Sequence, residues 1–287
     1  MDFGRVITAM VTPLNTDMSI DWNQVDALID YLIEEQLTDA IVVSGTTGES
    51  PTLSDEEKLQ LFEASVKRAN GRCRIIAGTG SNDTRHSIHL TQAAEKLGVD
   101  GVLLVAPYYN RPSQEGMYQH FKAIAESTKL PVMLYNVPHR TGIQLAADTT
   151  IRLSRIPNVV ASKEATPDLN HITEVISKSA EGFRVYGGDD SLTLPVLSIG
   201  GYGIVSVASH VIGREMKQMV EAFLGGENRR AAELHARLYP IFTGIFKVPS
   251  PAGIKHALNS KGVQVGGVRL PLLAVSPEEG RFVESLF

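Results

Sequence analysis

The stretch Asn158-Val159-Val160-Ala161-Ser162-Lys163-Glu164-Ala165-Thr166 gives the clearest indication of the fold. A short apolar run that begins just after Pro157 is typical of a buried parallel strand. We therefore predict a strand over residues 159–162, with Lys163 directly at its carboxyl end. In an α/β barrel, that end of each strand lies at the face where catalysis takes place.

The same unit, a short apolar strand followed by a helical pattern, recurs along the chain. The predicted strands cover residues 6–11, 40–43, 75–77, 101–105, 131–136, 159–162, 183–186 and 203–207. Strands that alternate with helices at intervals of roughly 20–35 residues are typical of a (β/α)8 TIM barrel. An open doubly wound sheet is the alternative, but no glycine-rich dinucleotide turn follows the first strand, which favours a closed barrel.

Helical patterns fill the intervals between the strands and the end of the chain. Helices are expected to begin at Asp21 and, with a capping box, at Ser54. Further helices are expected over residues 87–97, 114–128, 146–155 and 168–179, and in the tail over residues 227–239, 253–258 and 277–286. We predict a catalytic barrel domain over residues 1–224 and a small C-terminal helical domain over residues 225–287.

Composition excludes several classes of protein. A net charge of −5 without a run of Lys or Arg argues against a nucleic-acid or membrane-surface partner. We see no basic and then apolar leader, and no apolar segment long enough to span a bilayer. Cys73 is the only cysteine, so a disulfide within the chain is excluded and a cytoplasmic location is expected.

The residues that follow the predicted strands suit chemistry on a keto acid. Burial disfavours the charged form of an amine, and a neutral amine can attack a ketone to form a Schiff base. Hydroxyls can pass protons, and glycines expose backbone N–H groups to an anion. The strand ends offer Thr12, Thr46, Thr47, Gly78, Gly80, Tyr108, Tyr109, Tyr135, Lys163, Gly187, Gly188, Asp189, Asp190 and Ser206.

Each of these residues also has an ordinary structural explanation. A lone lysine just past a strand is usually a surface residue, and Tyr135 could be a core aromatic whose hydroxyl finds a backbone acceptor. Asp189-Asp190 has no histidine or third carboxylate near it in the sequence, so a tight turn is favoured over a metal site. The histidines are scattered without zinc-binding spacing, and we predict no metal.

Five motifs stand in order at the ends of successive strands. They are Gly45-Thr46-Thr47-Gly48-Glu49, Pro107-Tyr108-Tyr109-Asn110-Arg111-Pro112, Tyr135-Asn136-Val137-Pro138 with Arg140-Thr141-Gly142, Lys163-Glu164-Ala165-Thr166 and Gly188-Asp189-Asp190. Together they resemble the N-acetylneuraminate lyase and dihydrodipicolinate synthase family of class I aldolases. The resemblance covers essentially the whole chain, and the synthase branch is the more similar one.

This resemblance implies roles for the catalytic residues. Lys163 matches the lysine that forms a Schiff base with pyruvate, and Tyr135 matches the tyrosine that serves as acid and base. Thr46 matches the threonine that relays protons between two tyrosines. Tyr109 matches the second tyrosine, which in the family reaches across from a neighbouring subunit.

The resemblance also implies how the substrates are held. Thr47 matches the residue that binds the pyruvate carboxylate, and Arg140 matches the arginine that binds the carboxylate of L-aspartate 4-semialdehyde. Gly188 and Val205 match positions whose carbonyls lie near the substrates. The implied reaction condenses the two substrates to 4-hydroxy-tetrahydrodipicolinate, the first committed step towards diaminopimelate and lysine, without a cofactor. A homo-oligomer is implied, and we expect a tetramer built from dimers.

Alternative functions remain at this point. A lyase for N-acetylneuraminate or a 2-keto-3-deoxy acid would keep Lys163, Tyr135 and the glycine-threonine loop. Arg140 with the Tyr108-Tyr109 pair favours a small acidic aldehyde instead. A non-catalytic barrel that senses a keto acid and a phosphate-binding barrel enzyme are weaker alternatives.

One departure from the family concerns inhibition by lysine. Ser50, Asn82 and Tyr108 match an effector site at the dimer interface of lysine-inhibited members. Asp55, Lys58 and His86 stand where those members use histidine or glutamate. We therefore expect L-lysine to inhibit weakly or not at all.

Overall fold

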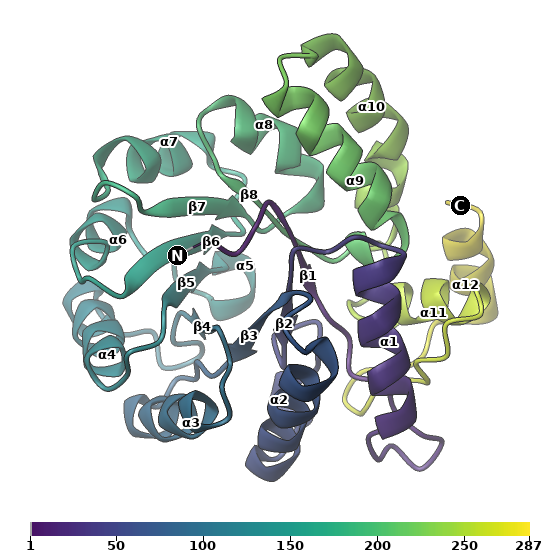
Figure 1. The fold of residues 1–287 in the computed structure, drawn as a ribbon, viewed down its shortest axis with the longest axis horizontal. Coiled ribbons are helices and arrows are strands. Elements are labelled where there is room, and N and C mark those ends of the chain that lie inside the picture. Colours follow the sequence, from purple (N-terminus) through teal and green to yellow (C-terminus); the bar gives the residue numbers. More distant parts are fainter. Residues whose placement is uncertain (1) are drawn as a thin grey trace.

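The computed structural model describes residues 2–287, and its parallel strands close into a barrel (Figure 1). Strand β1 pairs with both β2 and β8, so the ring of hydrogen bonds is complete. The predicted (β/α)8 barrel is confirmed, and the open doubly wound alternative is wrong. The strands are β1 (Val6–Ala9), β2 (Ala40–Val43), β3 (Arg74–Gly78), β4 (Gly101–Val105), β5 (Val132–Asn136), β6 (Val159–Glu164), β7 (Arg184–Gly187) and β8 (Gly203–Ser206).

Helices form a layer around the barrel (Figure 1). Side-chain caps start several of them, and Ser54 forms the predicted capping box with Glu57. The main helices of this layer are α1 (Trp22–Glu34), α2 (Asp55–Ala69), α3 (Thr84–Lys96), α4 (Gln114–Glu126), α6 (Ala147–Leu153), α7 (Leu169–Lys178) and α9 (Ser209–Leu224). The sequence pattern did not predict α9. It also did not predict the short helical segments η1 (Ser50–Thr52), α5 (Pro138–Thr141), η2 (Asp190–Leu192) and α8 (Thr193–Ser198).

Several boundaries differ from the prediction, and two of the differences have a clear physical reason. Strand β6 continues to Glu164, because Lys163 and Glu164 still pair with β5 and β7. Lys163 therefore belongs to the strand itself. Helix α3 begins at Thr84 and not at Ser87, because Asp83 accepts hydrogen bonds from the first backbone N–H groups.

Side chains of a barrel strand alternate between the lumen and the surrounding helices. Met133 and Ala161 belong to the apolar cluster that fills the lumen. Tyr135 and Lys163 follow them by one strand period, so both continue the inward-facing series towards the carboxyl end. The alternation places the predicted catalytic lysine inside the barrel.

The chain ends in three helices, α10 (Asn228–Gly244), α11 (Ala252–Ser260) and α12 (Pro277–Glu284). Helices α10 and α11 both contact α9, and the tail lies on one side of the ring (Figure 1). Phe242, Leu258 and Val283 share one hydrophobic cluster with residues of α1 and α2. The predicted tail helices are confirmed, whereas the division into two domains stays a prediction. Within residues 2–287, no helix is long and apolar enough to cross a membrane.

Candidate active site

Lys163 is buried at the carboxyl end of the barrel. Its side chain is only 5% exposed, and its Nζ lies 4.2 Å from the centre of the Tyr135 ring. The two residues are also paired in register between β5 and β6. Among residues 2–287, Lys163 Nζ has no hydrogen bond or ion pair, so no carboxylate of the described residues pairs with this amine.

A cavity of about 600 Å³ opens beside these strands. Three predicted site residues, Thr46, Tyr135 and Arg140, line it, as do the predicted effector residues Ser50, Asn82 and Tyr108. Lys163 does not line the cavity itself, but it contacts Tyr135, and Tyr135 is a lining residue. The predicted substrate-binding residues Thr47, Gly188 and Val205 are also outside the lining.

The loop after β2 holds Thr46 and Thr47 in a tight turn. Ser44 and Glu49, at either end of this turn, adopt left-handed backbone conformations with φ of 56° and 59°. At Gly48, a Cβ atom would lie 3.1 Å from the carbonyl oxygen of Met10. Glycine is therefore the residue that fits this turn without displacing its neighbours.

The loop after β4 separates its two tyrosines. Tyr108 lines the cavity, and its carbonyl oxygen accepts a hydrogen bond of 3.1 Å from Asn82 Nδ2. Tyr109 is 88% exposed, with a left-handed φ of 71°, and does not line the cavity of its own chain. A single chain therefore does not bring Tyr109 together with the other predicted catalytic residues.

Arg140 lies at the mouth of the cavity on the short helix α5. Gly142 ends this helix in the left-handed conformation, with φ of 73°. Arg140 is exposed and makes no ion pair with any described residue of the chain. Its guanidinium is available to bind a carboxylate that enters from solvent.

The loop after β7 is tied to its neighbours by backbone contacts. Gly188 N donates to the carbonyl oxygen of Glu164 over 2.8 Å, and a Cβ on Gly188 would lie 2.8 Å from that of Ala165. Asp190 is buried and accepts hydrogen bonds from the N–H groups of Val207 and Ala208 at 3.2 and 2.9 Å. Burial raises the pKa of Asp190 to about 6.

This loop forms the predicted tight turn. Asp189 accepts a hydrogen bond from Ser191 N and so caps η2. Within residues 2–287, no group of three or more His, Cys, Asp or Glu side chains gathers where it could hold a metal ion. Val205, the remaining predicted residue, is buried in β8 among the residues of the lumen cluster.

A polar cluster at the ends of β5 and β6 was not predicted from the sequence. Glu164 Oε2 accepts a hydrogen bond of 2.8 Å from Asn136 Nδ2 and lies 3.3 Å from His171 Nε2. Burial lowers the pKa of His171, but the hydrogen bond to Glu164 and its charge outweigh burial and raise that pKa. Asn136 and Glu164 directly follow Tyr135 and Lys163, so this cluster fixes the ends of both strands. In the sequence, the signal for this cluster was a polar residue directly after each inward-facing residue, namely Asn136 after Tyr135 and Glu164 after Lys163.

The residues that depart from the family's effector site interact with one another. His86 Nε2 lies 2.9 Å from Asp55 Oδ2, and Lys58 Nζ lies 3.9 Å from Asp55 Oδ1. Burial lowers the pKa of Lys58, although the charge of Asp55 opposes this. The carboxylate of Asp55, which also lines the cavity, therefore already has two basic neighbours, His86 and Lys58.

Comparisons with known proteins identify the family of the chain. The 4-hydroxy-tetrahydrodipicolinate synthase of Bacillus subtilis is 58% identical over 280 residues, which are 97% of this chain and 96% of the relative. A crystal structure of dihydrodipicolinate synthase from Bacillus anthracis superimposes with a TM-score of 0.98 at 55% identity, covering 100% of this chain and 98% of the other. Dihydrodipicolinate synthase from Cyanidioschyzon merolae with lysine bound gives a TM-score of 0.97 at 44% identity, covering 99% of this chain and 97% of the other. The Dihydrodipicolinate synthetase family matches residues 2–286, and the chain belongs to this family.

Proposed function

We propose that the chain catalyses the condensation of pyruvate with L-aspartate 4-semialdehyde to 4-hydroxy-tetrahydrodipicolinate, the first step of the lysine and diaminopimelate pathway. The observation that carries the proposal is the position of Lys163. Its amine is buried in the barrel lumen against Tyr135, and no carboxylate within residues 2–287 pairs with it. Relatives named for this reaction are 58% and 56% identical to the chain.

The first stage of the reaction forms an imine. Lys163 Nζ attacks the C2 ketone carbon of pyruvate, and loss of water from the carbinolamine gives the protonated Schiff base. Tyr135 lies against this amine and transfers the protons that the step requires. Thr47, in the tight turn after β2, binds the pyruvate carboxylate.

The second stage forms the carbon–carbon bond and closes the ring. The imine makes the C3 methyl group acidic, and removal of a proton gives an enamine whose carbon attacks the aldehyde of the semialdehyde. The amine of the semialdehyde then attacks the imine carbon and displaces Lys163, which is regenerated. Arg140 at the cavity mouth binds the semialdehyde carboxylate. Gly188 and Val205 present backbone carbonyls near the substrates, and the chemistry uses no cofactor.

A second subunit completes the site in this proposal. Tyr109 is almost fully exposed and does not line its own cavity, which supports insertion into a neighbouring subunit. There it exchanges protons with Tyr135 through Thr46. We propose a dimer as the smallest active unit and a tetramer built from two dimers, in the cytoplasm.

The effector site is proposed to bind lysine poorly. Ser50, Asn82 and Tyr108 line the cavity as an effector site would require. Asp55 already has His86 and Lys58 beside it, so it offers little to an incoming ammonium group. The buried Lys58 would also repel that group.

The experiment that tests the function measures turnover with competing substrates. Purified protein is given pyruvate with L-aspartate 4-semialdehyde, and formation of the cyclic product is followed by a coupled reductase assay. We expect turnover with this pair and none in the cleavage of N-acetylneuraminate or a 2-keto-3-deoxy acid. Faster cleavage of either sugar acid would overturn the proposal.

A further inference from the structure

The loop that carries Thr46 and Thr47 is joined to the C-terminal tail by a buried ion pair. Glu49, at the end of that loop, is 4% exposed, and Lys255 in α11 is 1% exposed. Lys255 Nζ donates to Glu49 Oε1 over 2.7 Å and to the carbonyl oxygen of Gly267 over 2.5 Å. The other carboxylate oxygen, Oε2, accepts from the backbone N of Arg269 over 2.8 Å. Both oxygens of Glu49 are thus occupied by the tail.

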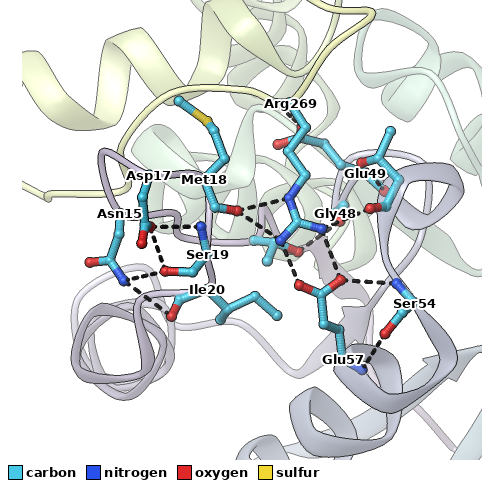
Figure 2. Close-up of polar contacts among 12 residues, drawn as sticks. Asn15, Asp17, Met18, Ser19, Ile20, Gly48, Glu49, Ser54, Glu57 and Arg269 are labelled. Carbon is cyan, nitrogen blue, oxygen red and sulfur yellow. Dashed lines mark hydrogen bonds and ion pairs between the residues drawn. The ribbon is translucent and has the colours of Figure 1, made fainter.

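Arg269 extends this contact to the start of α2 (Figure 2). Its NH1 and NH2 groups donate to the two carboxylate oxygens of Glu57 over 2.8 and 2.5 Å. The same guanidinium donates to the carbonyl oxygens of Thr52 and Met18. Because Glu57 also closes the capping box of α2, the tail is fixed to both sides of the segment between Glu49 and α2.

The backbone of Glu49 explains why such support is needed. Its φ of 59° is left-handed, which is strained for a residue with a side chain. Such a conformation persists only where the surroundings hold it. The backbone also continues the turn, since Glu49 N donates to the carbonyl oxygen of Thr46 and its own carbonyl oxygen accepts from Thr52 N.

We infer that Lys255, Glu49 and Arg269 act as positioning residues, through which the C-terminal tail holds Thr46 and Thr47 in the geometry needed for catalysis. The inference rests on the roles given to these threonines in the proposed function. It assigns the tail a part in the active site of its own subunit. None of the three residues touches substrate in this account.

The chain offers a control of similar geometry, although a more exposed one, at the opposite end of the barrel. Lys217 Nζ lies 2.7 Å from Asp39 Oδ1 and donates to the carbonyl oxygen of Leu37 over 3.2 Å. Lys255→Met and Lys217→Met therefore each remove an ion pair of the same length and one hydrogen bond to a carbonyl. Only Lys255→Met affects the loop after β2.

The experiment compares these two variants with the wild-type protein by hydrogen exchange and by kinetics. In Lys255→Met, we expect faster amide exchange over residues 44–53 and a fall in kcat/KM for pyruvate of about ten- to a hundredfold. A rise in KM should account for most of this fall, because Thr47 binds the pyruvate carboxylate. Lys217→Met should lower the thermal midpoint but leave loop exchange and kcat/KM at wild-type values.

Unchanged loop exchange in Lys255→Met would overturn the inference, as would equal losses of kcat/KM in the two variants. If Lys255→Met does not fold, Arg269→Lys replaces it, because this change keeps the charge but loses the forked contact with Glu57. It should also speed loop exchange and raise the KM for pyruvate, and wild-type values for both would overturn the inference. Loop exchange is independent of turnover, so an inactive wild-type protein would contradict the proposed function alone.

Discussion

The two ends of the barrel differ in how many of their polar groups have hydrogen-bond or ion-pair partners. At the amino end, Asp39 accepts hydrogen bonds from the backbone N of Arg5 and Val6 and pairs with Lys217. At the carboxyl end, four buried side-chain atoms have no hydrogen-bond partner among the described residues, namely Ser44 Oγ, Ser162 Oγ, Glu164 Oε1 and Asp190 Oδ1. Lys163 and Arg140, also at this end, form no ion pair with any described residue.

This difference indicates where stability and chemistry reside. Buried polar groups without partners destabilise a fold, and native proteins keep few of them. In TIM barrels the amino end of the strands serves stability and the carboxyl end serves catalysis. Substitutions at the carboxyl end should therefore reduce turnover more than stability, and those at the amino end should do the reverse.

The largest effect is expected for Tyr109→Phe. Removing one hydroxyl from an exposed loop should leave the thermal midpoint unchanged, whereas loss of a proton-transfer group should lower kcat by about a hundredfold. Steady-state kinetics and thermal melts would measure the two quantities. Tyr118→Phe, which removes a hydroxyl from α4, is the control and should retain wild-type turnover. A wild-type rate for Tyr109→Phe would remove Tyr109 from the proton relay.

Asp190→Asn should change how stability depends on pH. The folded-state pKa of Asp190 is raised to about 6, so folding favours its protonated form and stability falls as pH rises from about 4 to about 6. Burial lowers the pKa of His210 to about 4, and its contribution to stability rises over nearly the same interval. The two contributions oppose each other in the wild-type protein.

Asparagine at position 190 removes the contribution of Asp190 to this pH dependence but leaves that of His210. Its side-chain oxygen can still accept hydrogen bonds from the backbone N–H groups of Val207 and Ala208. Between pH 4 and pH 7, the free energy of unfolding of the variant should rise by about 3 kcal/mol relative to that of the wild-type protein. Urea unfolding at each pH measures this gain. Parallel pH profiles for the two proteins would show that Asp190 does not titrate as described.

Asp39→Ala tests the amino end. The change leaves the backbone N–H groups of Arg5 and Val6 without this acceptor and removes the ion pair with Lys217, which should lower the free energy of unfolding by about 2 kcal/mol. Because Asp39 does not line the cavity, kcat/KM should remain at the wild-type value. A loss of turnover without a loss of stability would contradict the proposed division between the two ends.

The smallest effect is expected for added L-lysine. Since Asp55 is engaged by His86 and Lys58, millimolar lysine should leave most of the activity intact. A titration of lysine at fixed pyruvate measures this, with Asp55→Glu as a variant that could restore binding. Half-inhibition by lysine below the millimolar range would show that the effector site is functional.

The sequence predicted the parts of this molecule that depend on local pattern. Short apolar runs predicted every strand, and the end of the sixth predicted strand indicated where Lys163 would lie. The contacts of Glu49 could not be predicted, because Lys255 and Arg269 are 206 and 220 residues away along the chain. Helix α5 was missed since its four residues are too few to show helical periodicity.

The central claim is that Lys163 forms a Schiff base with pyruvate, and reductive trapping tests it most directly. Wild-type protein and Lys163→Ala are treated with borohydride in the presence of pyruvate, and their peptides are analysed by mass spectrometry. We expect a covalent pyruvyl adduct on the peptide that carries Lys163 in the wild-type protein and none in the variant. No adduct in the wild-type protein, or an adduct on another lysine, would contradict the proposed mechanism.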